Sequence, residues 1–124
     1  MPTSIYTDLA MESRELNPEL QGVKEQTEEG EGISISRIEV ETEEAAQKLE
    51  KPIGHYITLD APELTNRPLD LFEQVSKSLA TELARLLEGV GPQATVLVVG
   101  LGNRAITSDS LGPKVAEQVY VTRH

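Results

Sequence analysis

The sequence contains no cysteine, no tryptophan and few aromatic residues, and each absence removes some classes of protein. Without cysteine the chain has neither a disulfide framework nor a thiolate nucleophile, which fits a reducing compartment. Aromatic residues make up 3% of the chain, so aliphatic side chains must fill its core. No apolar run approaches the roughly 20 residues that a membrane-spanning helix needs, and residues 1–6 lack the basic and apolar regions of a signal peptide. We therefore expect a cytoplasmic protein that does not contact a membrane.

Positive charge is also scarce. The chain has 11 basic and 21 acidic residues and a formal net charge of −10. Nonspecific nucleic-acid binding requires clustered lysine and arginine to contact the phosphates, so we expect no direct nucleic-acid partner. A length of 124 residues leaves room for one domain with one modest core.

Residues 12–32 are polar and rich in glutamate, and they show little periodicity. We predict that residues 1–32 form an acidic flexible arm and that residues 33–124 form part of an α/β domain. Residues 33–40 alternate apolar and polar side chains, and the alternation slips between Ile35 and Ile38. A half-buried strand with a bulge near Ser36 would explain that slip.

Two helices and a second strand follow from local patterns. Residues 42–49 predict a short helix capped by Thr42, and residues 56–59 predict a strand. The longest helix begins after Pro68 and ends at Gly89. Its apolar residues share one face, which we expect to be buried: Leu69, Phe72, Val75, Leu79, Leu83, Leu86 and Leu87. The opposite face should be exposed to water: Glu73, Lys77, Glu82 and Arg85.

The most informative stretch lies between residues 95 and 113. The apolar run 95–99 predicts a strand buried on both faces, and Gly100-Leu101-Gly102-Asn103 turns the chain at its end. Asp109 comes six residues after Asn103, and a further helix should begin near Lys114 with Val115 and Val119 inward. A strand buried on both faces needs neighbouring strands and helices. We therefore expect an α/β fold with a mixed sheet and flanking helices, the front part of a larger three-layer α/β domain.

Asp109 is the strongest candidate for chemistry, although an aspartate ahead of Pro113 also suits a turn or a helix cap. Its functional interpretation is one half of a carboxylate pair, in which one group acts as base and the other as acid. Three other acids are possible partners, but each is better explained as a turn or helix-start residue: Asp60, Glu63 and Asp70. His55 and His124 are too isolated to predict a metal site, and no cofactor is expected.

Residues 100–105 also fit the G-x-G-x-x-A pattern of dinucleotide-binding turns. That pattern requires a helix to begin within it. Here Ile106 and Thr107 favour extended structure, and Gly112-Pro113 delays the helix. The sequence therefore argues against a nucleotide site.

Several segments together resemble the germination endopeptidases of spore-forming Firmicutes. The family characteristically carries VGLGN, then T-P-D-A-L-G-P, then T-R-H, in that order. This chain has Val98 to Asn103, then Thr107 to Pro113, then Thr122 to His124. Residues 6–12 are similar to the family's R-T-D-L-A-V-E start, and residues 54–59 to its G-R-Y-x-T-L-E strand.

The resemblance implies an endopeptidase of atypical aspartic type that degrades small acid-soluble spore proteins at germination. It implies a protein of the forespore or spore core, made as a zymogen and assembled as a tetramer. Asp109 would be one catalytic aspartate, with its partner on a later strand beyond His124, so that this chain alone would be inactive. The active-site loop would contain Gly100, Gly102, Asn103 and Gly112. Ser108 departs from the family pattern, which commonly has proline there and hence a tighter turn.

The same resemblance implies where the zymogen is cut. Residues 7–10, Thr-Asp-Leu-Ala, are similar to the Thr-Glu-hydrophobic-Ala segments at which the family's substrates are cut. We therefore expect self-cleavage between Asp8 and Leu9, which would release residues 1–8 as a propeptide. An acidic residue in a frayed terminus is the other interpretation of Asp8.

Two alternatives remain open from the residues. One is a hydrogenase-maturation-type protease, which also joins a G-x-G-N turn to a following acid. That family commonly shows an Asp-Asp-x-x-Gly arrangement and recognises nickel. The other is a noncatalytic acidic α/β module whose glycine turn binds a peptide or a nucleotide.

Overall fold

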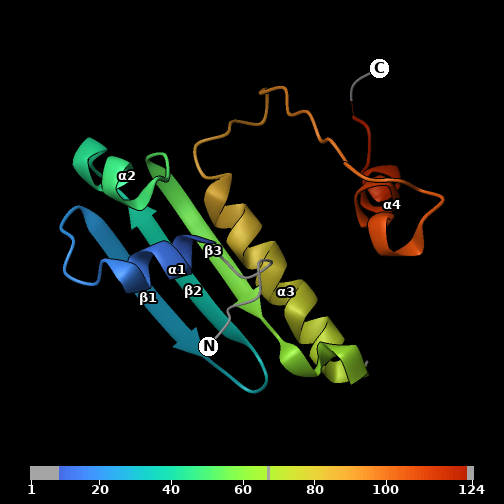
Figure 1. The fold of residues 1–124 in the computed structure, drawn as a ribbon. Helices are drawn as coiled ribbons and strands as arrows, with labels where there is room; N and C mark the ends of the chain where they lie inside the picture. The colour runs from blue at the N-terminus through green and yellow to red at the C-terminus, as the bar shows by residue number, and fades with distance from the viewer. Residues whose placement is uncertain (1–8, 67, 123–124) are drawn as a thin grey trace. The chain divides into compact units, whose positions relative to one another are not determined.

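The computed structural model describes residues 9–66 and 68–122, which divide into two compact units, Met1–Glu88 and Gly89–His124. The first unit contains α1 (Leu9–Leu16), β1 (Val23–Glu29), β2 (Ser34–Val40), α2 (Glu43–Leu49), β3 (Gly54–Asp60), a 3₁₀ helix (Pro62–Asn66) and α3 (Leu69–Leu86) (Figure 1). The second contains a 3₁₀ helix (Thr107–Asp109) and α4 (Leu111–Gln118). Among the described residues, no helix is both long and apolar enough to cross a membrane.

The three strands form one antiparallel sheet in the order β1-β2-β3. Val40 pairs with Val23 on one side and with Gly54 on the other, and the register runs unbroken back to Ser34. The strands predicted over residues 33–40 and 56–59 are therefore confirmed, but the predicted bulge near Ser36 is wrong. Because helices cover both faces of β2, Ile35 and Ile38 lie on opposite faces without any extra residue.

The core of the first unit lies on the sheet face covered by α1 and α2. Val40 packs there with Ala45, Ala46 and Leu49 of α2. The predicted cap is confirmed, since Thr42 Oγ1 accepts a hydrogen bond from the Ala45 N–H at 3.2 Å. This bond satisfies one of the amides left unpaired at the start of a helix.

Regular structure also forms within residues 12–32, where none was expected. Residues 23–29 form β1, and α1 extends to Leu16. The lack of apolar alternation has a physical cause: β1 is an edge strand, and its side chains from Lys24 to Glu29 are exposed. Backbone pairing with β2 forms this strand. The flexibility of the arm stays a prediction.

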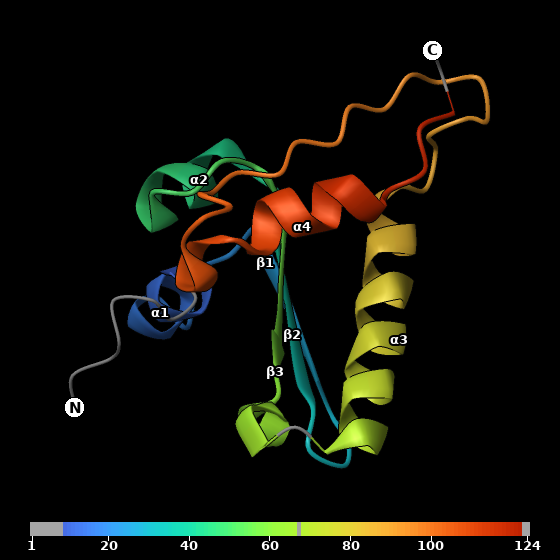
Figure 2. The same ribbon diagram turned by 90° about the vertical axis from the view of Figure 1, so that its right-hand side faces the viewer.

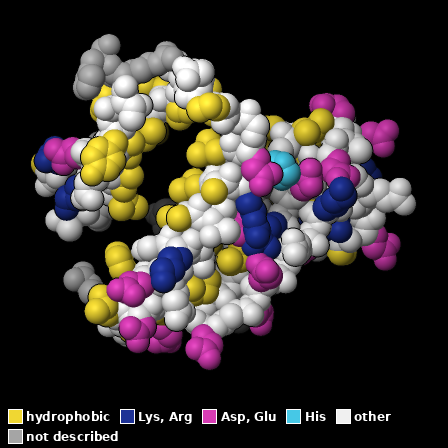
Figure 3. Space-filling view, turned by 180° about the vertical axis from the view of Figure 1, so that it is seen from behind, with side chains coloured by type: hydrophobic (Ala, Val, Ile, Leu, Met, Phe, Trp, Pro, Cys, Tyr) yellow, Lys and Arg dark blue, Asp and Glu magenta, His cyan; other side chains and the backbone are white. Residues whose placement is uncertain are grey.

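Helix α3 covers the other face of the sheet, which Figure 2 shows nearly edge-on between α1 and α3. Its bounds agree with the predicted helix, but its buried side is not the predicted one. The less exposed residues are Leu71, Val75, Ser78 and Glu82. Of the residues expected in a core, Val75 is half-buried and the others are exposed, including Phe72 at 58%, Leu79 and Leu83. Figure 3 shows hydrophobic side chains at the surface on this side of the molecule.

The second unit corrects two further expectations. Residues 95–99 form no strand, and Leu97 is 84% exposed, because no strand among the described residues pairs with this run. Helix α4 forms as expected but begins earlier, at Leu111, and both Val115 and Val119 are exposed. The α/β class with a sheet and flanking helices is confirmed, and the described sheet is antiparallel throughout.

Candidate active site

Asp109 ends the 3₁₀ helix of the second unit and lies just before α4. Two consecutive turns bring it there. The Ile106 N–H donates to the Asn103 carbonyl oxygen at 3.1 Å, and the Asp109 N–H donates to the Ile106 carbonyl oxygen at 2.9 Å. These short-range bonds fold residues 103–109 back upon themselves, so that Asp109 returns to the glycine turn.

The backbone N–H of Asn103 holds Asp109 at that turn. It donates to the Asp109 carbonyl oxygen at 2.8 Å and to the Asp109 carboxylate oxygen Oδ2 at 2.9 Å. A hydrogen bond from an amide to a carboxylate is stronger than one between neutral groups. The Asp109 residue is nevertheless exposed, so its carboxylate is fixed at one oxygen and still accessible to solvent.

Three glycines allow the two loop segments to approach at backbone distance. A Cβ atom at Gly102, whose φ is +142°, would collide with the Asp109 carbonyl oxygen. A Cβ at Gly100 would collide with the Gly112 carbonyl oxygen, and one at Gly112 with that of Leu101. Any larger residue would therefore push the turn away from Asp109.

Side chains around the loop complete its structure. The Asn103 side-chain oxygen accepts the Ala105 N–H at 2.9 Å. Ser110, only 2% exposed, donates its hydroxyl to the Thr107 carbonyl oxygen at 3.0 Å. Arg104 forms an ion pair with Glu117 of α4, which joins the loop to the helix.

The structure thus brings together the residues predicted as the active-site loop. Gly100, Gly102, Asn103 and Gly112 all lie against Asp109 or against one another. Their catalytic role stays a prediction, because these contacts alone would also suit a structural turn. Asp8 lies outside the described residues, so the cleavage point between Asp8 and Leu9 also stays a prediction.

The other predicted acids lie in the first unit. Asp60 ends β3, Glu63 lies in the first turn of the following 3₁₀ helix, and Asp70 lies in the first turn of α3. These are the turn and helix-start positions expected from the sequence. No group of three or more metal-ligating side chains occurs within residues 9–66 and 68–122.

The loop geometry also bears on nucleotide binding. A dinucleotide-binding turn leads directly into a helix whose amino terminus meets the pyrophosphate. Here α4 begins at Leu111, six residues after Ala105, with a 3₁₀ helix between them. The turn at residues 100–105 therefore lacks the feature that would hold a pyrophosphate.

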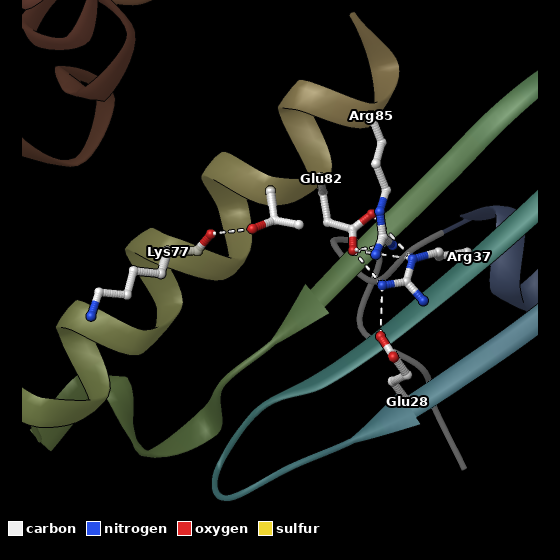
Figure 4. Close-up of polar contacts among 6 residues, drawn as sticks. Glu28, Arg37, Lys77, Glu82 and Arg85 are labelled. Carbon is white, nitrogen blue, oxygen red and sulfur yellow. Dashed lines mark hydrogen bonds and ion pairs between the residues drawn. The ribbon is translucent and has the colours of Figure 1, made fainter. Parts of the chain in front are cut away.

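An arginine–glutamate contact in the first unit has no local signal in the sequence (Figure 4). Glu82 of α3 is 3% exposed and accepts the Arg37 Nε–H at 3.1 Å from each carboxylate oxygen. Arg37 Nη2 also contacts Glu82 and donates to Glu28 of β1 at 2.7 Å. Hydrogen bonds from Arg37 lower the pKa of Glu82 below its ordinary value of 4.5, although burial opposes this. Glu82 was expected to be exposed because it lies beside exposed charged residues in the helical pattern.

A cleft of about 630 Å³ lies beside this contact, between the sheet and the carboxyl-terminal half of α3. Its lining carries charges of both signs, among them Lys24, Glu39, Arg85 and Glu88. Figure 3 shows basic side chains among acidic ones on this side of the molecule. A lining with charges of both signs favours neither an anionic nor a cationic ligand. The cleft therefore does not define a second site.

Comparison with known proteins identifies the family. The family model described as germination protease matches residues 3–124. The germination protease of Caldanaerobacter subterraneus subsp. tengcongensis is 46% identical over 122 residues, covering 97% of this chain and 37% of the relative. That of Clostridium perfringens strain 13 is 42% identical, covering 98% of this chain and 39% of the relative. That of Bacillus cereus strain AH187 is 38% identical, covering 98% and 35%.

The matches favour the protease predicted from the resemblance over the hydrogenase-maturation and noncatalytic alternatives, since the family model and these relatives are all named germination protease. The chain spans little more than a third of the length of the curated relatives it matches. Over that length, the chain belongs to the germination protease family.

Proposed function

We propose that this chain carries one of two catalytic carboxylates, Asp109, of an endopeptidase that begins the degradation of small acid-soluble spore proteins during germination. The observation that supports this most directly is the Asp109 carboxylate itself. It is fixed at Oδ2 by the Asn103 N–H, 2.9 Å away, yet exposed at the surface of a loop closed by glycines. A general acid or base needs this combination of fixed geometry and access to substrate and water.

The mechanism requires a second carboxylate. Asp109 would act as general base toward the attacking water or as general acid toward the leaving amine, and its partner would take the other role. We place the partner in the part of the relatives' length that this chain does not match. The 124-residue chain is accordingly inactive alone.

The remaining features belong to the same proposal. The protein is made as a zymogen that cuts itself between Asp8 and Leu9, works in the forespore or spore core, and assembles into a homo-oligomer. Its substrates are proteins, and neither a cofactor nor direct nucleic-acid contact enters the reaction. The Thr-Asp-Leu-Ala sequence of residues 7–10 supports the self-cleavage point.

The test is the Asp109→Asn substitution in the full-length protein. The amide keeps the size and an acceptor oxygen for the Asn103 N–H but cannot exchange a proton near neutral pH. Cleavage of a purified small acid-soluble spore protein should fall by at least about 100-fold, while the thermal unfolding midpoint stays unchanged. Glu73→Gln, a carboxylate-to-amide change at an exposed position of α3 outside the loop, is the control and should retain turnover. Retained cleavage in the Asp109 variant would exclude this residue from catalysis.

A further inference from the structure

The two oxygens of the Asp109 carboxylate have different surroundings. Oδ2 accepts the Asn103 N–H at 2.9 Å. Within the described part of the chain, no protein donor contacts the other oxygen, and the residue is exposed. One oxygen is thus held by the loop while the other is left to solvent. The direction of the solvent-facing oxygen, Oδ1, depends on how firmly the Asn103 N–H fixes Oδ2.

The direction of the Asn103 N–H is set by the backbone on both sides of it. Gly102 has a φ of +142°, a backbone conformation that residues with a side chain rarely adopt. On the other side, the Asn103 side-chain oxygen accepts the Ala105 N–H at 2.9 Å, which closes an Asx turn. The Asn103 carbonyl oxygen accepts the Ile106 N–H at 3.1 Å. These bonds fix the torsion angles of Asn103 and therefore the direction in which its own N–H points.

We infer that Asn103 is a positioning residue for Asp109, acting through this turn, an inference that rests on the proposed function. Its side chain does not contact the Asp109 carboxylate. It holds the backbone in the conformation in which the Asn103 N–H meets Oδ2, and so keeps the other carboxylate oxygen aimed at substrate or water. A shift of about 1 Å in a catalytic group can lower a rate about 100-fold.

The experiment uses Asn103→Ala in the full-length protein, because alanine removes the side-chain acceptor and keeps the backbone N–H. With a small acid-soluble spore protein as substrate, kcat should fall by about 10- to 100-fold while KM stays unchanged. Asn103→Ser supplies a hydroxyl acceptor that forms a weaker version of the same turn, and should recover part of the loss. Gln118→Ala removes another exposed amide, on α4, and should leave kcat unchanged.

Amide hydrogen exchange on the 124-residue chain gives a second readout that does not require activity. In Asn103→Ala the N–H groups of Asn103 and Ala105 should exchange faster, while those of β2 keep their wild-type rates. The same variants in the longer protein connect this loosening to kcat.

The outcomes separate the two claims. If Asp109→Asn abolishes cleavage but Asn103→Ala leaves kcat unchanged, the positioning role is wrong and the proposed function stands. A raised KM with unchanged kcat, or a loss that serine does not relieve, would also overturn the positioning role. Retained cleavage in Asp109→Asn would overturn the proposed function and the positioning role together.

Discussion

At the scale of the residue, a glutamate is buried on α3 because an arginine on the facing sheet neutralises it. Glu82 and Arg37 lie 45 positions apart in the sequence and meet through the two Nε bonds of 3.1 Å. Burying an unpaired carboxylate would be costly, whereas a hydrogen-bonded pair compensates much of that cost. Glu28 and Arg85 extend the pair into a charged cluster that joins β1, β2 and α3.

The lowered pKa of Glu82 makes this contact sensitive to pH. A carboxylate whose pKa is lower in the folded state stabilises the fold above its unfolded pKa, near 4.5, and loses that contribution as pH falls through the folded value. Glu82→Gln should lower the free energy of unfolding by about 2 kcal/mol at pH 7. The difference from the wild type should begin to shrink near pH 4.5, where Glu82 of the unfolded chain takes up a proton, and should be lost below the lowered pKa of the folded state, where Glu82 is protonated in both states.

Urea unfolding between pH 3 and pH 7 measures this difference. Glu73→Gln, the same change at an exposed position of α3, should alter stability by less than about 0.5 kcal/mol at every pH. A Glu82→Gln variant that is as stable as the wild type at pH 7 would show that the ion pair is energetically neutral.

At the scale of the element, α3 shows that an apolar stripe does not by itself identify the buried side of a helix. In this chain Leu71 is 9% exposed, whereas Leu83, a member of the predicted core face, is 49% exposed. We predict that Leu71→Ala costs about 2 kcal/mol. The same truncation at Leu83 should cost less than about 0.5 kcal/mol.

Urea unfolding of the two leucine variants side by side is the measurement. Because the chemical change and the helix are identical, any difference reports the surroundings of each leucine. Equal losses would mean that the apolar stripe is covered in solution.

The elements that could be predicted from the sequence are those whose signals are local. The Thr42 cap, the bounds of α3 and the strands β2 and β3 are set by neighbouring residues. Strand β1 could not be predicted, because its pairing with β2 depends on backbone groups rather than on apolar side chains. Residues 95–99 were predicted wrongly because a buried strand depends on neighbouring strands, which no local pattern reveals. Glu82 was missed because its partner, Arg37, lies on a different element.

At the scale of the whole molecule, the division of the chain after Glu88 predicts that the first unit folds by itself. The three strands of the described residues, α3 and the core around Val40 lie in the first unit. If that unit contains its own stabilising contacts, it does not need residues 93–124 to fold. Cutting after Pro92 keeps Gly89, whose φ of +88° favours glycine just beyond the end of α3.

Residues 1–92 should therefore unfold cooperatively, within about 4 °C of the corresponding transition in the 124-residue chain. A larger shift would correspond to about 1 kcal/mol or more for a domain of this size. Calorimetry gives the transition temperature. A comparison of the backbone amide NMR spectra of the two chains shows whether the strand pairing from Val23 to Asp60 is kept. The Glu82→Gln substitution in the shortened chain should cause the same loss of stability as in the longer one, because Arg37 and Glu28 lie in the same unit. Loss of cooperativity after the cut would show that the first unit does not fold independently.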